Sequence, residues 1–278
     1  MTDTVGQRVQ RYILDGSDDD LRRLVAASEL LADSARTALR RSGIQAGWSV
    51  IECGCGPVGA LTVMAELAGQ AGRVVGVELN PAAVRRAQSV VDTLGLENVQ
   101  VIAGDVNELE MAAAGGPFDL AFTRLFLMHQ PDPVRTLRQI SGLLRPGGWI
   151  IAQEPLVSPA PRSFPHLDAL DTYWQLAIKL VEGLGVPANS VERLPQSAAA
   201  AGLEVVRVDG SFAVTSPDRG FGIHAATLAA ARERATAAGL VSGEEIDALV
   251  AELRAAAGHG HEWATSPFFL DLTLRKAG

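Results

Sequence analysis

Short apolar runs alternate with amphipathic stretches between residues 49 and 155, and this alternation restricts the fold more than any other feature of the sequence. Strands that alternate with helices at this spacing form right-handed βαβ units, and such units build a parallel sheet. The expected strands are residues 49–53, 73–79, 99–105, 117–123 and 149–155. The expected helices are residues 60–70, 81–95 and 132–148. We therefore predict an α/β fold with a parallel sheet for this part of the chain.

Helices are expected before this region, and both helices and strands after it. An acidic run at residues 18–20 precedes apolar residues that recur roughly every 3.6 positions up to Leu39, which predicts one helix with Gly43 at its end. A proline-rich linker at residues 158–165 follows the last strand of the alternating region. Beyond it, helices are expected at residues 166–183, 190–201 and 218–256, and strands at 203–214 and 267–277.

Composition excludes several classes of protein. The 278 residues are 47% hydrophobic and 20% charged, which argues for a buried core and against disorder. A formal net charge of -8 argues against a broad nucleic-acid surface. The absence of a signal peptide and of a long apolar stretch predicts a cytoplasmic protein with no membrane span. Cys53 and Cys55 lie too close for a disulfide and have no further ligand nearby, so we expect no metal.

Glycines follow the first predicted strand and precede the first predicted helix, in the segment ECGCGPVG at residues 52–59. Glycine allows sharp turns and lets the backbone approach a ligand closely. The free amides at the start of a helix suit a polar or anionic group. Many α/β proteins use glycine only to turn, so this segment by itself leaves a cofactor site and a simple turn as alternatives.

Acidic residues stand at or beside the carboxyl ends of the first three predicted strands. Glu52, Glu78 and Asp105 occupy these positions. A carboxylate after the second strand can accept two hydrogen bonds from a ribose diol, and ligands of open α/β sheets bind at this edge. Each acid could also cap a helix or lie in solvent. Three acids at one edge together favour a nucleotide-like ligand.

The ordered segments VIECGCGPVG, VVGVELNP, AGDV, FDLAFTRLFLMHQPDP and LLRPGGWIIAQEP resemble the class I S-adenosylmethionine-dependent methyltransferases. The resemblance covers about residues 44–155 and is greatest to the small-molecule group similar to ubiquinone/menaquinone C-methyltransferases. It implies a Rossmann-like sheet of seven strands, mostly parallel with an antiparallel last strand, and S-adenosyl-L-methionine as the cofactor.

The resemblance also implies roles on the methionine side of the cofactor. Glu52, Gly54 and Gly56 would face the methionine part, and Arg124 would lie at the methionyl group. One position departs from the family pattern, because Val58 stands where the third glycine is usual. A β-branched residue disfavours positive φ, so the geometry of this loop and the affinity for the cofactor come into question.

On the adenine side, Glu78 would hold the ribose hydroxyls, with Leu79 against the adenine ring. Asp105 and Val106 would fix the adenine edge. These four residues complete the set that the resemblance assigns to cofactor binding.

A general base is expected after the fourth strand. His129 precedes Asp132 by three residues, as a histidine does in the phosphobase methyltransferases, where it works with a tyrosine of the N-terminal helical region. Tyr12 could supply that tyrosine. A partly buried structural histidine is the alternative for His129.

Further residues could contact the substrate. Glu154 either touches substrate or is solvated, and several aromatic side chains either line a substrate pocket or form core. These aromatic residues are Phe126, Tyr173, Trp174 and Phe221.

We therefore expect an enzyme with a helical N-terminal lid at residues 1–43 and a class I methyltransferase domain at residues 44–278. Substrate-cap insertions are expected at about residues 155–198 and 216–258. The expected partner is a small, hydrophobic metabolite that is methylated on O, N or C; a homodimer is left open, and nucleic acid is not expected. Two alternatives are a non-methylating cyclisation with the same cofactor in a natural-product pathway and a dinucleotide-dependent oxidoreductase.

Overall fold

The computed structural model describes residues 18–183, 187, 189–258 and 263–278. The chain divides into two compact units. The sheet unit comprises Ala32–Pro155, Ser190–Ser211 and Phe269–Gly278. The helical unit comprises Met1–Leu31, Leu156–Asn189 and Phe212–Phe268.

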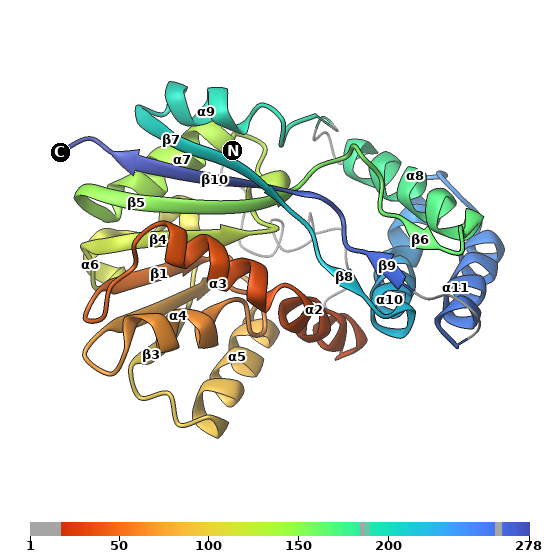
Figure 1. Cartoon of the computed structure of the whole chain (residues 1–278), viewed down its shortest axis with the longest axis horizontal. Helices are drawn as coiled ribbons and strands as arrows, with labels where there is room; N and C mark the ends of the chain where they lie inside the picture. The colour runs from red at the N-terminus through yellow and green to blue at the C-terminus, as the bar shows by residue number, and fades with distance from the viewer. Residues whose placement is uncertain (1–17, 184–186, 188, 259–262) are drawn as a thin grey trace. The chain divides into compact units, whose positions relative to one another are not determined.

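Seven strands form the sheet of the sheet unit (Figure 1). In chain order they are β1 (Ser49–Cys53), β2 (Arg73–Glu78), β3 (Val99–Ala103), β4 (Phe118–Arg124), β5 (Leu144–Pro155), β7 (Leu203–Ser211) and β10 (Phe269–Lys276). Their order in space is β3-β2-β1-β4-β5-β10-β7. The first five are mutually parallel, whereas β10 is antiparallel to both β5 and β7. The predicted seven-stranded, mostly parallel sheet with an antiparallel last strand is confirmed.

Helices connect these strands and cover the sheet. They are α3 (Ala32–Arg41), α4 (Leu61–Ala68), α5 (Pro81–Thr93), α6 (Met111–Ala114), α7 (Pro133–Gly142) and α9 (Leu194–Ala200), with the 3-10 turns η1 (Val106–Glu108) and η2 (Leu127–His129). The chain steps in one direction from β1 to β3 and in the other from β4 to β5. Right-handed connections therefore place α4 and α5 on one face and α7 on the other.

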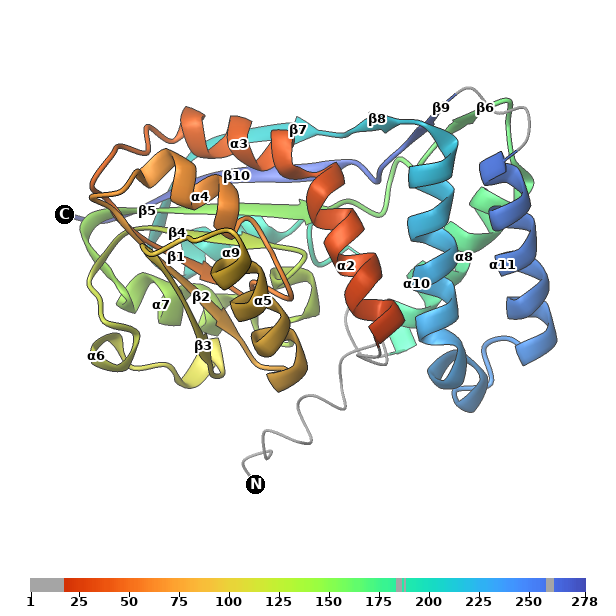
Figure 2. The same ribbon diagram turned by 90° about the horizontal axis from the view of Figure 1, so that it is seen from below.

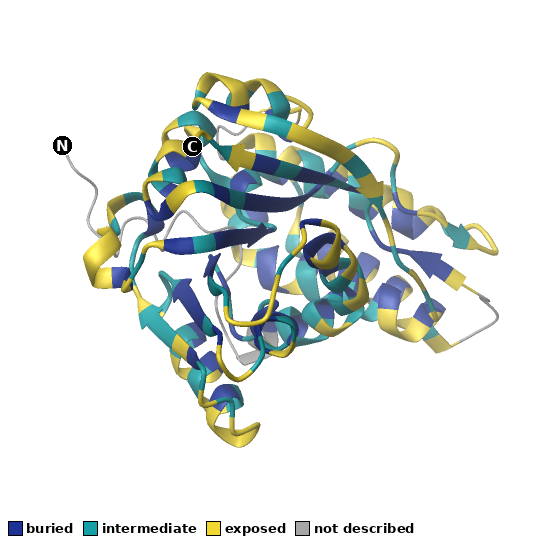
Figure 3. Cartoon of the chain, turned by 60° about the vertical axis from the view of Figure 1, so that its left-hand side comes forward, coloured by how far each residue is buried: buried dark blue, intermediate teal, exposed yellow. Residues whose placement is uncertain are grey.

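The core of the sheet unit lies between its strands and the helices packed on them. The central strands are almost wholly buried, as Figure 3 shows. Leu39 from α3, Met64 from α4 and Phe122 from β4 are completely buried. Apolar burial of this kind is the main favourable term in folding, and it fixes the strand ends on which the candidate site is built.

The helical unit consists of α2 (Asp18–Leu30), α8 (Asp168–Gly183), α10 (Pro217–Ala237) and α11 (Gly243–Gly258), together with three short strands (Figure 2). The strands β6 (Ser163–Phe164), β8 (Val214–Thr215) and β9 (Trp263–Thr265) pair in the order β6-β9-β8. Apolar side chains of α8, α10 and α11 form one core cluster. Within the described residues, no helix is long and apolar enough to cross a membrane.

Three predicted helices have different boundaries in the structure. The predicted helix that ends at Gly43 is two helices, α2 and α3, divided at Leu31. The stretch 218–256 is also two helices, because Gly239 takes a φ of 67° and Ser242 with Glu245 forms a reciprocal capping box that starts α11.

The third difference is the end of the helix predicted at residues 132–148. Helix α7 ends at Gly142, and β5 begins at Leu144. Lys276 of β10 donates to the carbonyl oxygens of Ser141 (2.9 Å) and Leu144 (2.7 Å), which satisfies acceptors at this junction. Lys276 and Leu144 are separated by 132 residues in the sequence, so local pattern alone does not reveal this contact. The short three-stranded sheet was also missed, because two of its strands have only two residues each.

Candidate active site

The candidate site lies at the carboxyl ends of β1 to β4. Strands β1 and β4 are neighbours, and the chain leaves them in opposite directions across the sheet. This is the switch point at which open α/β sheets bind ligands. The topology brings the segments after these four strands to one edge, and they carry the residues that the sequence analysis singled out.

The glycine loop, residues 54–59, contains three glycines in the left-handed region. Gly54, Gly56 and Gly59 have φ values of 74°, 58° and 55°. The amides of Gly54 and Cys55 donate to the Val77 carbonyl oxygen of β2 at 2.8 and 3.0 Å. A Cβ at Gly56 would meet no atom within 4 Å, so the backbone there is open to a ligand.

Val58 does not disturb this loop. Leu125 is the one non-glycine residue with positive φ in the described part of the chain, so Val58 needs no unfavourable conformation. The third left-handed position belongs to Gly59, where a Cβ would lie 2.5 Å from both carboxylate oxygens of Glu52. The question that Val58 raises about the loop geometry is therefore answered, because the glycine requirement is met one residue later, at Gly59. Its bearing on cofactor affinity stays a prediction.

Glu52 lies beneath the glycine loop and is only 1% exposed. Both of its carboxylate oxygens accept the Ala60 amide proton, at 2.9 and 2.8 Å. Burial raises the pKa of Glu52 to about 8, although Arg124 and the Ala60 amide lower it. Arg124 is also buried and donates to the Gly59 carbonyl oxygen at 3.2 Å. Glu52 and Arg124 thus bind the end of the loop where α4 begins.

Glu78 at the end of β2 is half-buried beside the glycine loop. One carboxylate oxygen accepts the Gly56 amide at 3.0 Å, and the other accepts the Asn80 amide at 2.7 Å. Burial raises its pKa, while these amides lower it. A carboxylate has about four lone-pair positions, so acceptor capacity is left for a ligand hydroxyl. Leu79, the next residue, is also half-buried.

Asp105 and Val106 follow β3 on the same edge. The Asp105 carboxylate accepts the Asn107 amide at 2.8 Å and caps η1, while the Val106 side chain is buried. The Asn107 side chain then donates to Gln130, in the segment after β4, at 3.0 Å. The Thr136 hydroxyl of α7 donates to Asn107 at 2.8 Å. Neither Asn107 nor Gln130 was selected from sequence, because a lone amide side chain in a loop has no distinctive pattern.

The post-β4 segment, residues 125–129, follows Arg124 and carries the candidate base. His129 is half-buried on η2, and its backbone amide donates to the Phe126 carbonyl oxygen at 3.1 Å. Phe126 packs on the backbone of Gly54, where a Cβ would collide with its ring.

Glu154 at the end of β5 is completely buried, so its interpretation as a solvated acid is wrong. Its carboxylate accepts backbone amides of the post-β4 segment, and burial raises its pKa to about 7.

Other candidates lie elsewhere. Tyr12 falls outside the described residues. Tyr173 and Phe221 belong to the buried core of the helical unit, and the Tyr173 ring lies 4.7 Å from the His224 ring. Burial lowers the pKa of His224 to about 4. Trp174, partly buried in the same unit, donates from its indole to the Val157 carbonyl oxygen at 2.8 Å.

Cys53 and Cys55 are free and buried, and burial raises the pKa of both thiols. Because the thiolate is the reactive form, neither is suited to act as a nucleophile. No group of three or more His, Cys, Asp or Glu side chains that could hold a metal occurs among the residues described above.

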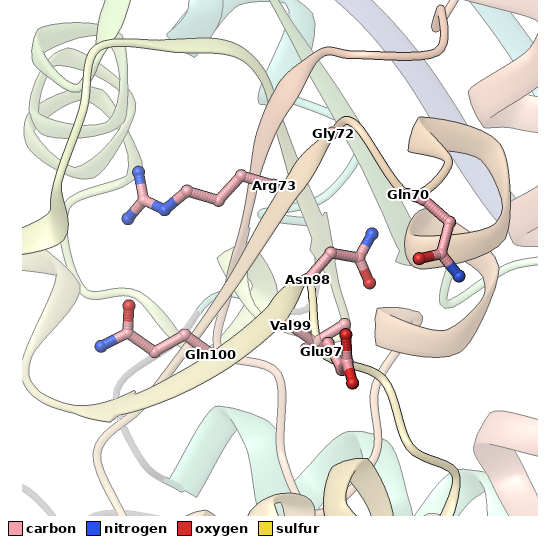
Figure 4. A pocket seen from close by; sticks show the side chains of 7 residues that line it. All are labelled: Gln70, Gly72, Arg73, Glu97, Asn98, Val99 and Gln100. Atoms are coloured by element: carbon pink, nitrogen blue, oxygen red, sulfur yellow. The ribbon is translucent and has the colours of Figure 1, made fainter.

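A polar hollow of about 440 Å³ lies at the opposite, amino ends of β2 and β3 (Figure 4). Its lining includes Arg73 and Asn98. The Arg73 guanidinium already donates to the carbonyl oxygens of Ala114 and Gly115, and Asn98 donates to that of Gly69. These donors are engaged within the protein, so we do not assign this hollow to a ligand.

The strand order and the acidic edge define the class I S-adenosylmethionine-dependent methyltransferase fold. The chain belongs to the methyltransferase domain family, whose family model matches residues 44–202. It is 29% identical over 233 residues to an uncharacterized 37.1 kDa protein of transposon TN4556 from Streptomyces fradiae, a match over 82% of this chain and 61% of that protein. It is 25% identical over 119 residues to a demethylmenaquinone methyltransferase of Geobacillus stearothermophilus, over 43% of this chain and 50% of the relative. The matches thus span less than two thirds of these relatives.

Solved structures support the same fold. A SAM-dependent methyltransferase from Aquifex aeolicus gives a TM-score of 0.54 at 18% identity, covering 69% of this chain and 92% of that one. The [4+2]-cyclase SpnF gives a TM-score of 0.54 at 20% identity, covering 87% and 79%. At these identities the likeness extends to the fold alone.

The glycine loop makes a first prediction. Gly59→Ala places a Cβ against the Glu52 carboxylate and forces a positive φ on alanine, so it should lower the free energy of unfolding by about 2 kcal/mol or more. Gly142→Ala, at the end of α7 with open space around it, is the control and should change stability by less than about 1 kcal/mol. Denaturant unfolding measures both. Equal stability of the two variants would contradict this account of Gly59.

The raised pKa of Glu154 predicts a pH-dependent stability difference. The folded protein keeps this proton up to about pH 7, whereas an unfolded glutamate loses it near pH 4.5. The difference in unfolding free energy, wild type minus Glu154→Gln, should therefore decrease as pH rises from about 4.5 to about 7 and then level off. His224, whose lowered pKa has the opposite effect, is present in both proteins and cancels. A difference that rises over this range would contradict the assignment.

Proposed function

We propose that the sheet unit binds S-adenosyl-L-methionine along the carboxyl ends of β1 to β4 and that the protein transfers its methyl group to O, N or C of a small, hydrophobic molecule. The observation that carries the proposal is the Glu78 carboxylate, 3.0 Å from the Gly56 amide and next to backbone that is open to a ligand. A diol-binding acid beside a glycine loop is the arrangement that nucleotide-like cofactors require.

The residues present fit this cofactor. The Glu78 carboxylate retains acceptor capacity toward neutral hydroxyl donors, and Asp105 follows β3 on the same edge. Half-buried Leu79 offers apolar surface for the adenine ring, and the buried Val106 packs under the edge that would carry it. The open backbone at Gly56 lets the methionine part approach closely. Glu52 would act from beneath the loop, since its buried carboxylate is engaged with Ala60.

In the proposed mechanism, the bound cofactor supplies an electrophilic methyl group. Glu78 and Asp105 would hold the ribose and the adenine edge, so that the cofactor would be positioned by the strand ends. Such positioning is a large part of catalysis for an in-line displacement. His129 removes a proton from the acceptor atom where the nucleophile requires it.

The remaining assignments extend this proposal. The partner is a small metabolite and the expected setting is the cytoplasm, while the lid role of residues 1–43, 155–198 and 216–258 stays a prediction. The acidic net charge of -8 supports a small-molecule substrate over nucleic acid.

A cyclisation without methyl transfer is the second candidate function. The likeness to the cyclase SpnF supports it to the extent that the same fold carries that activity. Both functions use the same cofactor site, so the product distinguishes them. A substrate that gains one methyl group supports transfer, whereas a converted substrate of unchanged mass supports cyclisation.

Cofactor binding can be tested with S-adenosylhomocysteine by isothermal titration calorimetry. Wild type should bind, and Glu78→Gln should weaken affinity about 10-fold or more, because a charged acceptor for the ribose hydroxyls is lost. Glu66→Gln, on exposed α4 surface, is the matched control and should bind like wild type. Stabilisation of wild type by NADH but not by S-adenosylhomocysteine would favour the oxidoreductase instead.

A variant of His129 distinguishes cofactor binding from catalytic turnover. His129→Ala should bind S-adenosylhomocysteine within about threefold of wild type while turnover falls by about 10²-fold or more, the usual contribution of a general base. His166→Ala is the histidine control, because His166 is 66% exposed and lies beside Asp168 and Asp171. Full turnover in His129→Ala would remove the base assignment.

A further inference from the structure

We propose that Glu154 is a positioning residue whose buried carboxylate holds the post-β4 segment in place against the glycine loop by accepting three successive backbone amide protons. The geometric part of this inference is independent of function. Its consequence for cofactor affinity rests on the proposed function.

The contacts of Glu154 are specific to this segment. The Leu127 amide donates to one carboxylate oxygen at 2.9 Å, and the Met128 amide donates to the other at 3.3 Å. The Phe126 amide is shared between both oxygens at 3.2 and 3.1 Å. These amides belong to the start of η2, where backbone N–H groups have no partner within the helix. The carboxylate of a distant strand therefore caps this turn.

Glu154 is completely buried, so water cannot replace it as the acceptor for these amides. A buried carboxylate is costly unless it is hydrogen-bonded, and a buried N–H group is also costly without an acceptor. The two groups therefore satisfy one another. Burial raises the pKa of Glu154, while the amides of Leu127, Phe126 and Met128 and the neighbouring Thr123 hydroxyl lower it.

This arrangement constrains the residues on both sides of the amides. Leu125 has a φ of 53°, which a leucine keeps only when its surroundings require it. Its amide donates to the Gln153 carbonyl oxygen at 3.1 Å, and the next three amides bind Glu154. Phe126 is thereby held on Gly54 of the glycine loop, and His129 follows one residue after the last of these amides.

The chain offers a close control for this role. Asp271 of β10 is another buried acid of the same sheet, and it accepts the Gln153 side-chain amide at 2.9 Å. Gln153 directly precedes Glu154, and neighbouring residues of a strand point to opposite faces of the sheet. Asp271→Asn therefore alters a buried acid that is bound to the Gln153 side chain, while the Gln153 carbonyl oxygen that accepts the Leu125 amide is kept.

The experiment compares Glu154→Met, Glu154→Gln and Asp271→Asn by hydrogen exchange and by titration with S-adenosylhomocysteine. Methionine fills a similar space but accepts no strong hydrogen bond, and replacement of a buried charge by an apolar side chain is often neutral for stability. In Glu154→Met, amide protection at residues 126–128 should be lost and affinity for S-adenosylhomocysteine should fall on the order of 10-fold. Glu154→Gln, which retains one acceptor oxygen, should be intermediate, and Asp271→Asn should keep wild-type values of both.

Wild-type protection at residues 126–128 in Glu154→Met would overturn the inference, and so would an unchanged affinity alongside lost protection. In the unliganded wild type these three amides should exchange more slowly than those of exposed loops; equal rates would also overturn it, even if no variant folds. If the wild type does not bind S-adenosylhomocysteine but the exchange results hold, the proposed function fails while the positioning of the segment stands.

Discussion

The rest of the site depends on the interaction between the buried Glu52 carboxylate and the Ala60 amide. The carboxylate lies under the glycine loop, accepts the Ala60 amide with both oxygens and leaves no room for a side chain at Gly59. Arg124 offsets part of its charge and binds the Gly59 carbonyl oxygen. Burying a carboxylate is costly to its charged form, which raises the pKa of Glu52 to about 8, and Arg124 and the Ala60 amide offset part of that cost. The loop is therefore shaped from below, before any ligand is bound.

Hydrogen bonds from this loop to the neighbouring segments make the strand ends one connected edge. Glu78 joins the glycine loop to β2, and Asn107 with Gln130 joins the segment after β3 to that after β4. Glu154 then holds the segment after β4 from the fifth strand. A site whose side chains and backbone are held in advance loses less entropy when it binds, which favours affinity and alignment of the reacting groups.

The sequence was sufficient to predict the parts of this account that depend on local pattern. The alternation of apolar runs with amphipathic stretches predicts the strands. The positions of Glu78 and Asp105 at the strand ends then follow from the topology of a parallel sheet. The roles of Glu52 and Glu154 could not be predicted, since the depth of a side chain depends on the elements packed over it. The same limit applies to the end of α7, which is bound by Lys276, and to the position of the third essential glycine at residue 59.

A crystal structure of the complex with S-adenosylhomocysteine tests the central claim most directly. The account predicts the ribose hydroxyls on the Glu78 carboxylate, the adenine beside Asp105 and Val106, and the amino-acid part along the backbone near Gly56. It also predicts that the glycine loop keeps the conformation described here, with Glu52 still bound to the Ala60 amide. A ligand at the amino ends of β2 and β3, or a loop that rearranges so that Glu52 leaves Ala60, would contradict it.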